Sequence, residues 1–171
     1  PVKELIGLIK TQRAFELISR HKVRNVFLPA TVLKMMRLVP DPRKHWNLNL
    51  RSIHTGGESV GEDIIRWTEE ALGCTPHEGF GQTEATLVVG NCSLLMPVKP
   101  GALGRPVPGH TVELLDDAGA IVPVGEIGEL SVRRPDPVMF LRYWNDEAAT
   151  RDKFTGDWMR TGDLGRQDAD G

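Results

Sequence analysis

A heptapeptide near the middle of the chain, Glu-Gly-Phe-Gly-Gln-Thr-Glu, carries the clearest chemical signal in this sequence. Gly79 and Gly81 allow the backbone on either side of Phe80 to approach a ligand, and a base stacked on the ring would gain about 1–3 kcal/mol. Thr83 and Glu84 follow at the expected start of a helix, where backbone donors favour phosphate oxygens and a hard cation accepts a carboxylate ligand. The pattern predicts a site for a nucleotide with Mg²⁺. A glycine turn with a buried Phe80 and a helix cap explains the same residues equally well.

A second candidate site lies near the end of the chain, at Thr161-Gly162-Asp163. An Asp on a glycine turn offers two acceptor oxygens, which match the paired hydroxyls of a ribose. The same tripeptide is also a common turn without a ligand. The last four residues, Asp-Ala-Asp-Gly, could begin a calcium loop, but the glutamate that such a loop requires is missing from this sequence. We therefore expect a hairpin turn at residues 168–171.

Three other kinds of site find no support in the sequence. A dinucleotide fingerprint that starts at Gly79 needs a glycine at its sixth position, where this chain has Glu84. No glycine-rich loop with a Walker lysine occurs. Cys74, His77 and Cys92 lack the paired C-x-x-C spacing and the fourth ligand of a zinc site, which favours structural roles for them.

The composition is that of a globular protein with little net charge. The 171 residues include 21 Lys and Arg against 23 Asp and Glu, and 40% are apolar. The formal charge of −2 gives no basic field that would recruit nucleic acid. The apolar stretches fall far short of the roughly 20 residues that a membrane helix needs. With only two cysteines and no leader peptide in evidence, we expect a reducing cytoplasm.

Alternating helices and strands are expected in the first half of the chain. The pattern predicts a helix over residues 11–22, capped by Thr11, then a strand over 23–28, and then a helix whose apolar stripe is Val32, Met35, Met36 and Val39. A strand over 51–54 leads into the loop that holds Gly57 and Glu58, a capping box at 59–62 starts the next helix, and Gly73 ends it. This order favours an α/β fold with a partial parallel sheet and flanking helices, whose ligand site lies at the carboxyl ends of the strands.

Short period-2 runs replace this pattern from Lys99 onward. Strands are expected over residues 111–115, 120–122 and 129–133, with a turn at 116–119. The chain is therefore predicted to comprise an α/β subdomain over residues 1–98, which holds the loops of the candidate nucleotide site, and a small β-rich subdomain, a distorted barrel, over residues 99–171.

Six short motifs occur in an order and spacing that resemble the AMP-forming adenylating enzymes. They are Gly56-Gly57-Glu58, Gly79 to Glu84, Gly101 to Pro106, Gly125 to Leu130, Trp158 to Asp163 and Asp168 to Gly171. Asn91-Cys92 and Tyr143-Trp144 make the chain most similar to acetyl- and medium-chain acyl-CoA synthetases. The resemblance covers nearly the whole chain and is weakest over residues 1–10.

The resemblance implies roles for individual residues. Phe80 would stack on adenine, Thr83 would contact the α-phosphate, and Asp163 would bind the ribose hydroxyls. Glu84 would help to hold Mg²⁺ and, with Thr83, would take part in catalysis. The Gly57-Glu58 pair would lie at the adenine edge and beside the acyl pocket. The nucleotide-binding set that the resemblance implies is Gly57, Glu58, Gly79, Phe80, Gly81, Gln82, Thr83 and Asp163.

The resemblance also implies a reaction and a division of labour. These enzymes activate a carboxylic acid with ATP to an acyl adenylate and pyrophosphate, and then transfer the acyl group to coenzyme A. Their phosphate loop, hinge and catalytic lysine have no counterpart in this sequence, so we expect part of a large N-terminal domain that is inactive alone and self-associates through severed sheet edges. Two alternatives stay open: an adenylation domain that loads a carrier-protein thiol, and a nucleotide-binding or interaction module without chemistry of its own.

Overall fold

The computed structural model describes the backbone of residues 2–171 and the side chains of residues 11–171. The chain forms two compact units that interleave along the sequence. The first contains residues up to Gly79 and residues 91–103, and the second contains residues 80–90 and 104–171. The sequence-based division at 98/99 into functional subdomains stays a prediction.

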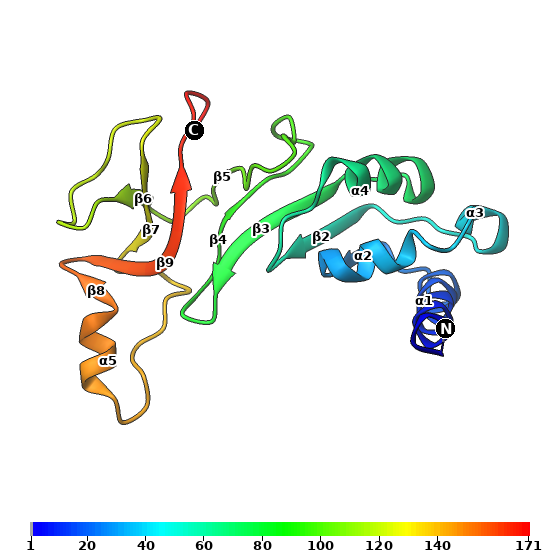
Figure 1. Ribbon diagram of the computed structural model, residues 1–171, viewed down its shortest axis with the longest axis horizontal. Coiled ribbons are helices and arrows are strands. Elements are labelled where there is room, and N and C mark those ends of the chain that lie inside the picture. Colours follow the sequence, from blue (N-terminus) through cyan, green and yellow to red (C-terminus); the bar gives the residue numbers. More distant parts are fainter. Residues whose placement is uncertain (1) are drawn as a thin grey trace. The chain divides into compact units, whose positions relative to one another are not determined.

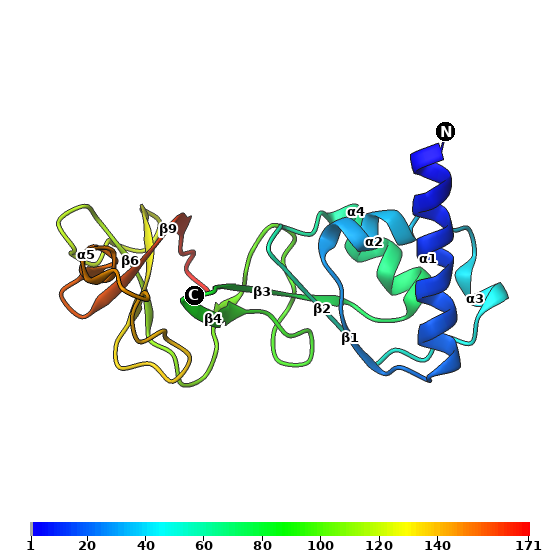
Figure 2. The same cartoon turned by 90° about the horizontal axis from the view of Figure 1, so that it is seen from below.

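The first unit is a layer of parallel strands with helices packed on it (Figure 2). Strands β1 and β2 pair in parallel from Asn25↔Ser52 to Phe27↔His54, and β2 and β3 pair in parallel from Ile53↔Pro76 to Gly56↔Gly79. The elements in chain order are α1 (Val2–Arg20), β1 (Asn25–Phe27), α2 (Ala30–Met36), α3 (Pro42–His45), β2 (Ser52–Gly56), α4 (Glu62–Trp67), the π-helical turn η1 (Thr68–Leu72) and β3 (Pro76–Gln82).

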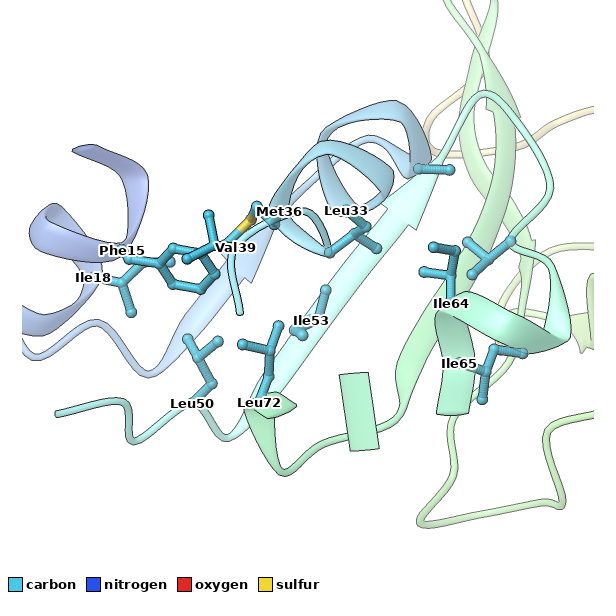
Figure 3. Packing of buried hydrophobic residues seen from close by; sticks show 12 residues of the cluster. Phe15, Ile18, Leu33, Met36, Val39, Leu50, Ile53, Ile64, Ile65 and Leu72 are labelled. Atoms are coloured by element: carbon cyan, nitrogen blue, oxygen red, sulfur yellow. The ribbon is translucent and has the colours of Figure 1, made fainter. Parts of the chain in front are cut away.

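The core of this unit gathers around Ile53 of β2, as Figure 3 shows. Leu33 and Met36 of α2 are completely buried there, as is Ile64 of α4. Helices α2 and α4 both pack on β2. The loop that follows β2 therefore begins at a well-packed strand. The other buried apolar members are Phe15, Ile18, Ala30, Val39, Leu50, Val60, Ile65 and Leu72.

Three expectations for this unit were wrong in detail. Helix α1 begins at Val2, so Thr11 lies inside the helix and does not cap it. In α2 the buried stripe contains Leu33, while Met35 is exposed, since the helix turns that side away from β2. The capping box is absent: Gly61 is the N-cap of α4 and no side chain bonds to it. The predicted end at Gly73 is confirmed.

The second unit is built on a curled antiparallel sheet with strand order β6-β7-β9-β8 (Figure 1). Its core contains Val88, Val132 and Met159, all completely buried, with Phe80 and Phe140 packed against them at partial burial. The fold class predicted from the sequence, α/β followed by a β-rich subdomain, is confirmed. The elements are β4 (Ala85–Gly90), β5 (Arg105–Pro106), β6 (Val112–Leu115), β7 (Ile127–Arg133), α5 (Glu147–Asp152), β8 (Phe154–Thr155) and β9 (Trp158–Arg166).

Local structure in the second unit differs from expectation at three places. No helix starts at Glu84, because Thr83 and Glu84 form a turn from the end of β3 into β4. Gly81 makes this tight return possible: a Cβ there would lie 2.2 Å from the backbone nitrogen of Leu87. Residues 120–122 form only an isolated bridge beyond the predicted 116–119 turn. Residues 161–163 lie inside strand β9 and not on a turn.

Candidate nucleotide-binding site

Gln82 connects the two segments that the sequence singled out separately. Its amide nitrogen donates to the carboxylate of Asp163 at 2.7 Å and to the carbonyl of Thr161 at 2.8 Å. Both bonds lie within the second unit and join residues about 80 positions apart in the chain. The end of β3 and the middle of β9 therefore form one polar surface, on which the Asp163 side chain is exposed.

A β-bulge in β9 presents Asp163. The pairing of β7 with β9 shifts register between Glu129 and Ser131. Gly162 has a φ of 85°, a backbone conformation that residues with a side chain rarely adopt. Asp163 donates its N–H to the Thr161 hydroxyl at 3.1 Å, and that hydroxyl donates to the carbonyl of β7 opposite it at 2.7 Å. The bulge turns the carboxylate out of the strand without ending the strand.

Glu129 of the neighbouring strand β7 stabilises the bulge through hydrogen bonds. Its carboxylate accepts the N–H of Gly162 and the Nε–H of Arg160, both at 2.7 Å, and a further bond from the Arg160 guanidinium. Burial opposes ionisation of Glu129, but the bonds from Arg160 and Gly162 outweigh it and leave the pKa of Glu129 below its ordinary value of 4.5. The charged form of Glu129 is thus the form that stabilises the bulge.

Acid should therefore loosen this part of the second unit. Because the folded-state pKa of Glu129 is depressed, its stabilising contribution is present above pH 4.5 and is lost as the pH falls through the folded-state value. We expect Glu129→Gln to lower the denaturant midpoint at neutral pH and to reduce its loss on acidification. Urea unfolding at several pH values measures both effects, with the exposed Glu126→Gln as a control. An unchanged pH dependence in Glu129→Gln would refute this role.

Glu84 is held at both its backbone and its side chain by one segment. The carbonyl of Glu84 accepts the N–H of Phe140 at 2.7 Å, and its carboxylate accepts the phenol O–H of Tyr143 at 2.6 Å. The Tyr143 bond lowers the pKa of Glu84. The same bond, together with burial, raises the pKa of Tyr143 to about 12. Glu84 is therefore an ionised carboxylate that is half-buried beside β4.

The other predicted residues of this loop lie within a few positions of Glu84. Phe80 is half-buried and packs against the core of the second unit, whereas Thr83 is exposed in the turn. The structure brings Gln82, Glu84 and Asp163 onto elements of one unit. It leaves the stacking role of Phe80 and the phosphate contact of Thr83 as predictions.

Gly57 and Glu58 belong to the first unit, in the loop that follows β2. Both are exposed, and the Glu58 carboxylate lies 3.6 Å from the ammonium group of Lys34 in α2. An exposed ion pair of this kind contributes little stability. Gly79 is paired with Gly56 at the end of the parallel ladder.

Glu78 opens the heptapeptide that the sequence analysis singled out, but no role was predicted for it. Its side chain is 4% exposed, and one carboxylate oxygen accepts the N–H of Val60 from the loop after β2. Its backbone N–H donates to the Asn91 side chain at 3.0 Å. The second oxygen, Oε2, is buried and has no partner among the described residues. The available signal was an acidic residue inside a strand, because carboxylates are rarely buried unless they are paired or hydrogen-bonded.

The chemistry of the Glu84 carboxylate fits one hard cation. Within the described part of the chain, no three His, Cys, Asp or Glu side chains gather closely enough to hold a metal ion by themselves. Mg²⁺ commonly uses one or two carboxylates together with phosphate oxygens, and Glu84 meets that smaller requirement.

Comparison with known proteins decides the family. The model of the AMP-binding enzyme family matches residues 6–144. The chain belongs to this family. The chain is similar to a benzoate-CoA ligase of Thauera aromatica, with 33% identity over 87% of this chain, and to an uncharacterized acyl-CoA ligase of Bacillus subtilis, with 32% identity over 96% of it.

Solved structures of adenylate-forming enzymes share this fold. An anthranilate CoA ligase in complex with anthranoyl-AMP is 30% identical and superposes with a TM-score of 0.84 over 94% of this chain, and a Brucella canis acyl-CoA synthetase gives the same TM-score at 29% identity. The chain spans about a third of these relatives, 31% of the Bacillus protein and 31% of the anthranilate ligase. Among the described residues, no helix is long and apolar enough to cross a bilayer.

Proposed function

We propose that this chain supplies the adenosine-binding and cation-binding part of an acid-thiol ligase, which activates a carboxylic acid with ATP and passes the acyl group to coenzyme A. The observation that carries the proposal is the bond between Gln82 and Asp163, because it joins two family motifs into one surface. The relatives named above as benzoate and anthranilate CoA ligases each join a carboxylic acid to coenzyme A.

The proposed binding mode assigns one task to each group. Phe80 stacks on adenine. Asp163 accepts hydrogen bonds from the ribose hydroxyls, while Gln82 keeps its carboxylate oriented. Thr83 contacts the α-phosphate, and the Gly57-Glu58 loop lies at the adenine edge and beside the acyl pocket.

Glu84 is the residue that would hold Mg²⁺. When bound, the cation neutralises negative charge on the phosphates during attack by the carboxylic acid. Glu84 contributes a carboxylate that is ionised at neutral pH and fixed by Tyr143 and Phe140. Thr83 and Glu84 lie in the same turn, so the proposed phosphate contact and the proposed cation ligand are adjacent in the chain.

The setting of the parent enzyme is part of the proposal. Cys74 and Cys92 are both free, which supports a reducing compartment such as the cytoplasm.

Strand β1 lies at the edge of the parallel ladder, and its residue Phe27 is 63% exposed. We therefore propose that the 171-residue chain self-associates. A carrier-protein thiol in place of coenzyme A is the alternative acceptor.

ATP–pyrophosphate exchange tests the activity. We expect exchange with the full-length enzyme that carries this chain and a panel of aromatic and aliphatic acids, and none with the 171 residues alone, because the groups that bind the pyrophosphate are missing from this sequence. Turnover by the chain alone would show that it is a complete catalyst. Absence of exchange in the full-length protein with every acid would favour a binding module.

A Phe80 variant tests the adenine site in the same protein. We expect Phe80→Ala to weaken ATP and AMP binding by about 1–3 kcal/mol through the lost stacking, and Phe80→Tyr to retain it. Isothermal titration calorimetry measures both affinities. Because Phe80 also packs against the core, Phe154→Leu serves as a control that perturbs the same cluster. Equal losses of affinity in Phe80→Ala and Phe154→Leu would make Phe80 a packing residue only.

A further inference from the structure

Tyr143 approaches Glu84 from a segment far along the chain. Its phenol oxygen lies 2.6 Å from Oε1 of Glu84, and the two residues are 59 positions apart. The phenol bonds to Oε1 and not to the other carboxylate oxygen, Oε2. It therefore fixes the carboxylate through one of its two oxygens.

The phenol is not on a free loop. The Tyr143 N–H donates to the Thr150 hydroxyl at 3.0 Å, and that hydroxyl donates to the Asp146 carbonyl at 2.7 Å, in the residue that caps α5. The Tyr143 ring packs against Phe140, with ring centroids 4.8 Å apart. Helix α5 and an aromatic neighbour thus fix the backbone and the ring of Tyr143 before the phenol meets Glu84.

Backbone pairing brings the same segment onto β4. Met139 forms a bridge with Ala85, and the Phe140 N–H bonds to the Glu84 carbonyl at 2.7 Å. The main chain of Glu84 and its carboxylate are therefore held by consecutive parts of residues 139–143. A hydrogen bond that only satisfied a surface carboxylate would not need this double attachment.

We propose that Tyr143 is a positioning residue, which orients the Glu84 carboxylate so that Oε2 faces the cation of the bound nucleotide. The inference rests on the proposed function of Glu84 as a cation ligand. Hydrogen bonds from neighbouring side chains to a ligating group fix its orientation, and their loss commonly costs about 10- to 100-fold in metal affinity or activity. Tyr143 acts through Glu84 and does not itself touch the cation.

The contact can be tested without activity, because Tyr143 is the single tyrosine of the 171-residue chain. Chain labelled with ¹³Cζ-tyrosine gives one NMR resonance, whose position reports the hydrogen bond of the phenol. We expect Glu84→Gln to shift this resonance and Glu147→Gln, which changes an exposed carboxylate on α5, to leave it in place. An unshifted resonance in Glu84→Gln would overturn the proposal.

A double-mutant cycle in the full-length enzyme tests the role. We expect Tyr143→Phe, which removes only the hydroxyl, to raise the Mg²⁺ concentration for half-maximal pyrophosphate exchange about tenfold or more, with an unchanged KM for the acid. In a Glu84→Gln background the same change should have no further effect. Trp144→Phe, at an exposed neighbour, is the matched control.

The outcomes separate the two proposals. A Tyr143→Phe effect that persists in full beside Glu84→Gln, or no effect at all, would overturn the positioning role. An unaltered Mg²⁺ requirement in Glu84→Gln alone would remove Glu84 as a cation ligand and with it the proposed function of that residue. Should Tyr143→Phe fail to fold, Thr150→Val loosens the phenol without removing it, and additivity with Glu84→Gln would again overturn the role.

Discussion

Replacing Glu84 with glutamine should reduce the adenylation rate of the full-length enzyme by about 100-fold or more, since loss of a ligand should exceed the roughly 10- to 100-fold cost of losing a group that only orients one. Glutamine keeps the size of the side chain but removes the negative charge that a hard cation requires. The Mg²⁺ requirement should rise, whereas AMP binding and the melting temperature should stay close to those of the parent.

Pyrophosphate exchange across a range of Mg²⁺ concentrations measures the first two effects, and calorimetry with AMP measures the third. Glu147→Gln, at an exposed position of α5, is the control for loss of one carboxylate. If Glu84→Gln unfolded the protein and left the Mg²⁺ dependence of the remaining activity unchanged, Glu84 would be a structural residue of the turn.

Replacing Asp163 with alanine should weaken binding of ATP and AMP alike by roughly 1.5–3 kcal/mol, because charge-assisted hydrogen bonds to the ribose hydroxyls are lost. The local structure should persist. Gln82 keeps its bond to the Thr161 carbonyl, and the bond from Thr161 to β7 does not involve the Asp163 side chain. The loss should therefore appear in nucleotide affinity and not in the melting temperature.

Calorimetry with ATP, AMP and 2′,3′-dideoxy-AMP distinguishes this role from a structural one. The parent should bind the dideoxy nucleotide more weakly than AMP, and Asp163→Ala should bind the two about equally. Asp152→Ala, at an exposed carboxylate of α5, should retain the parent's preference. A preference for AMP that survived in Asp163→Ala would mean that another group binds the ribose.

Local patterns in the sequence predicted much of the scaffold. Although the residues of β3 were interpreted as a glycine loop, the alternation of helices and strands predicted the parallel pairing of β1 and β2, and the apolar face ending at Gly73 is buried as expected. The 116–119 turn forms, with the Asp116 side chain accepting the N–H of Ala120. Each of these features depends on residues a few positions apart, so periodicity and turn chemistry are sufficient to predict them.

The same local patterns misled at the site itself. A helix was expected to start at Thr83 and Glu84, but the Ala-Thr-Leu-Val-Val run after them forms β4. Asp163 was placed on a turn because Thr-Gly-Asp is a turn sequence, whereas Glu129 and Arg160 hold it as a bulge inside β9. In both places a strand partner outside the motif overrides the local preference.

By itself the sequence determined the alternation of helices and strands up to Gly73 and the candidate polar residues, because these follow from short-range periodicity and from side-chain chemistry. Only the tertiary structure decided which polar residues meet. Gln82 bonds to Asp163 and Tyr143 to Glu84 across 81 and 59 positions, and no local signal encodes such pairs. They arise because strand pairing in the second unit and the cap of α5 bring distant backbone segments together, so that polar side chains far apart in the sequence lie within hydrogen-bond distance.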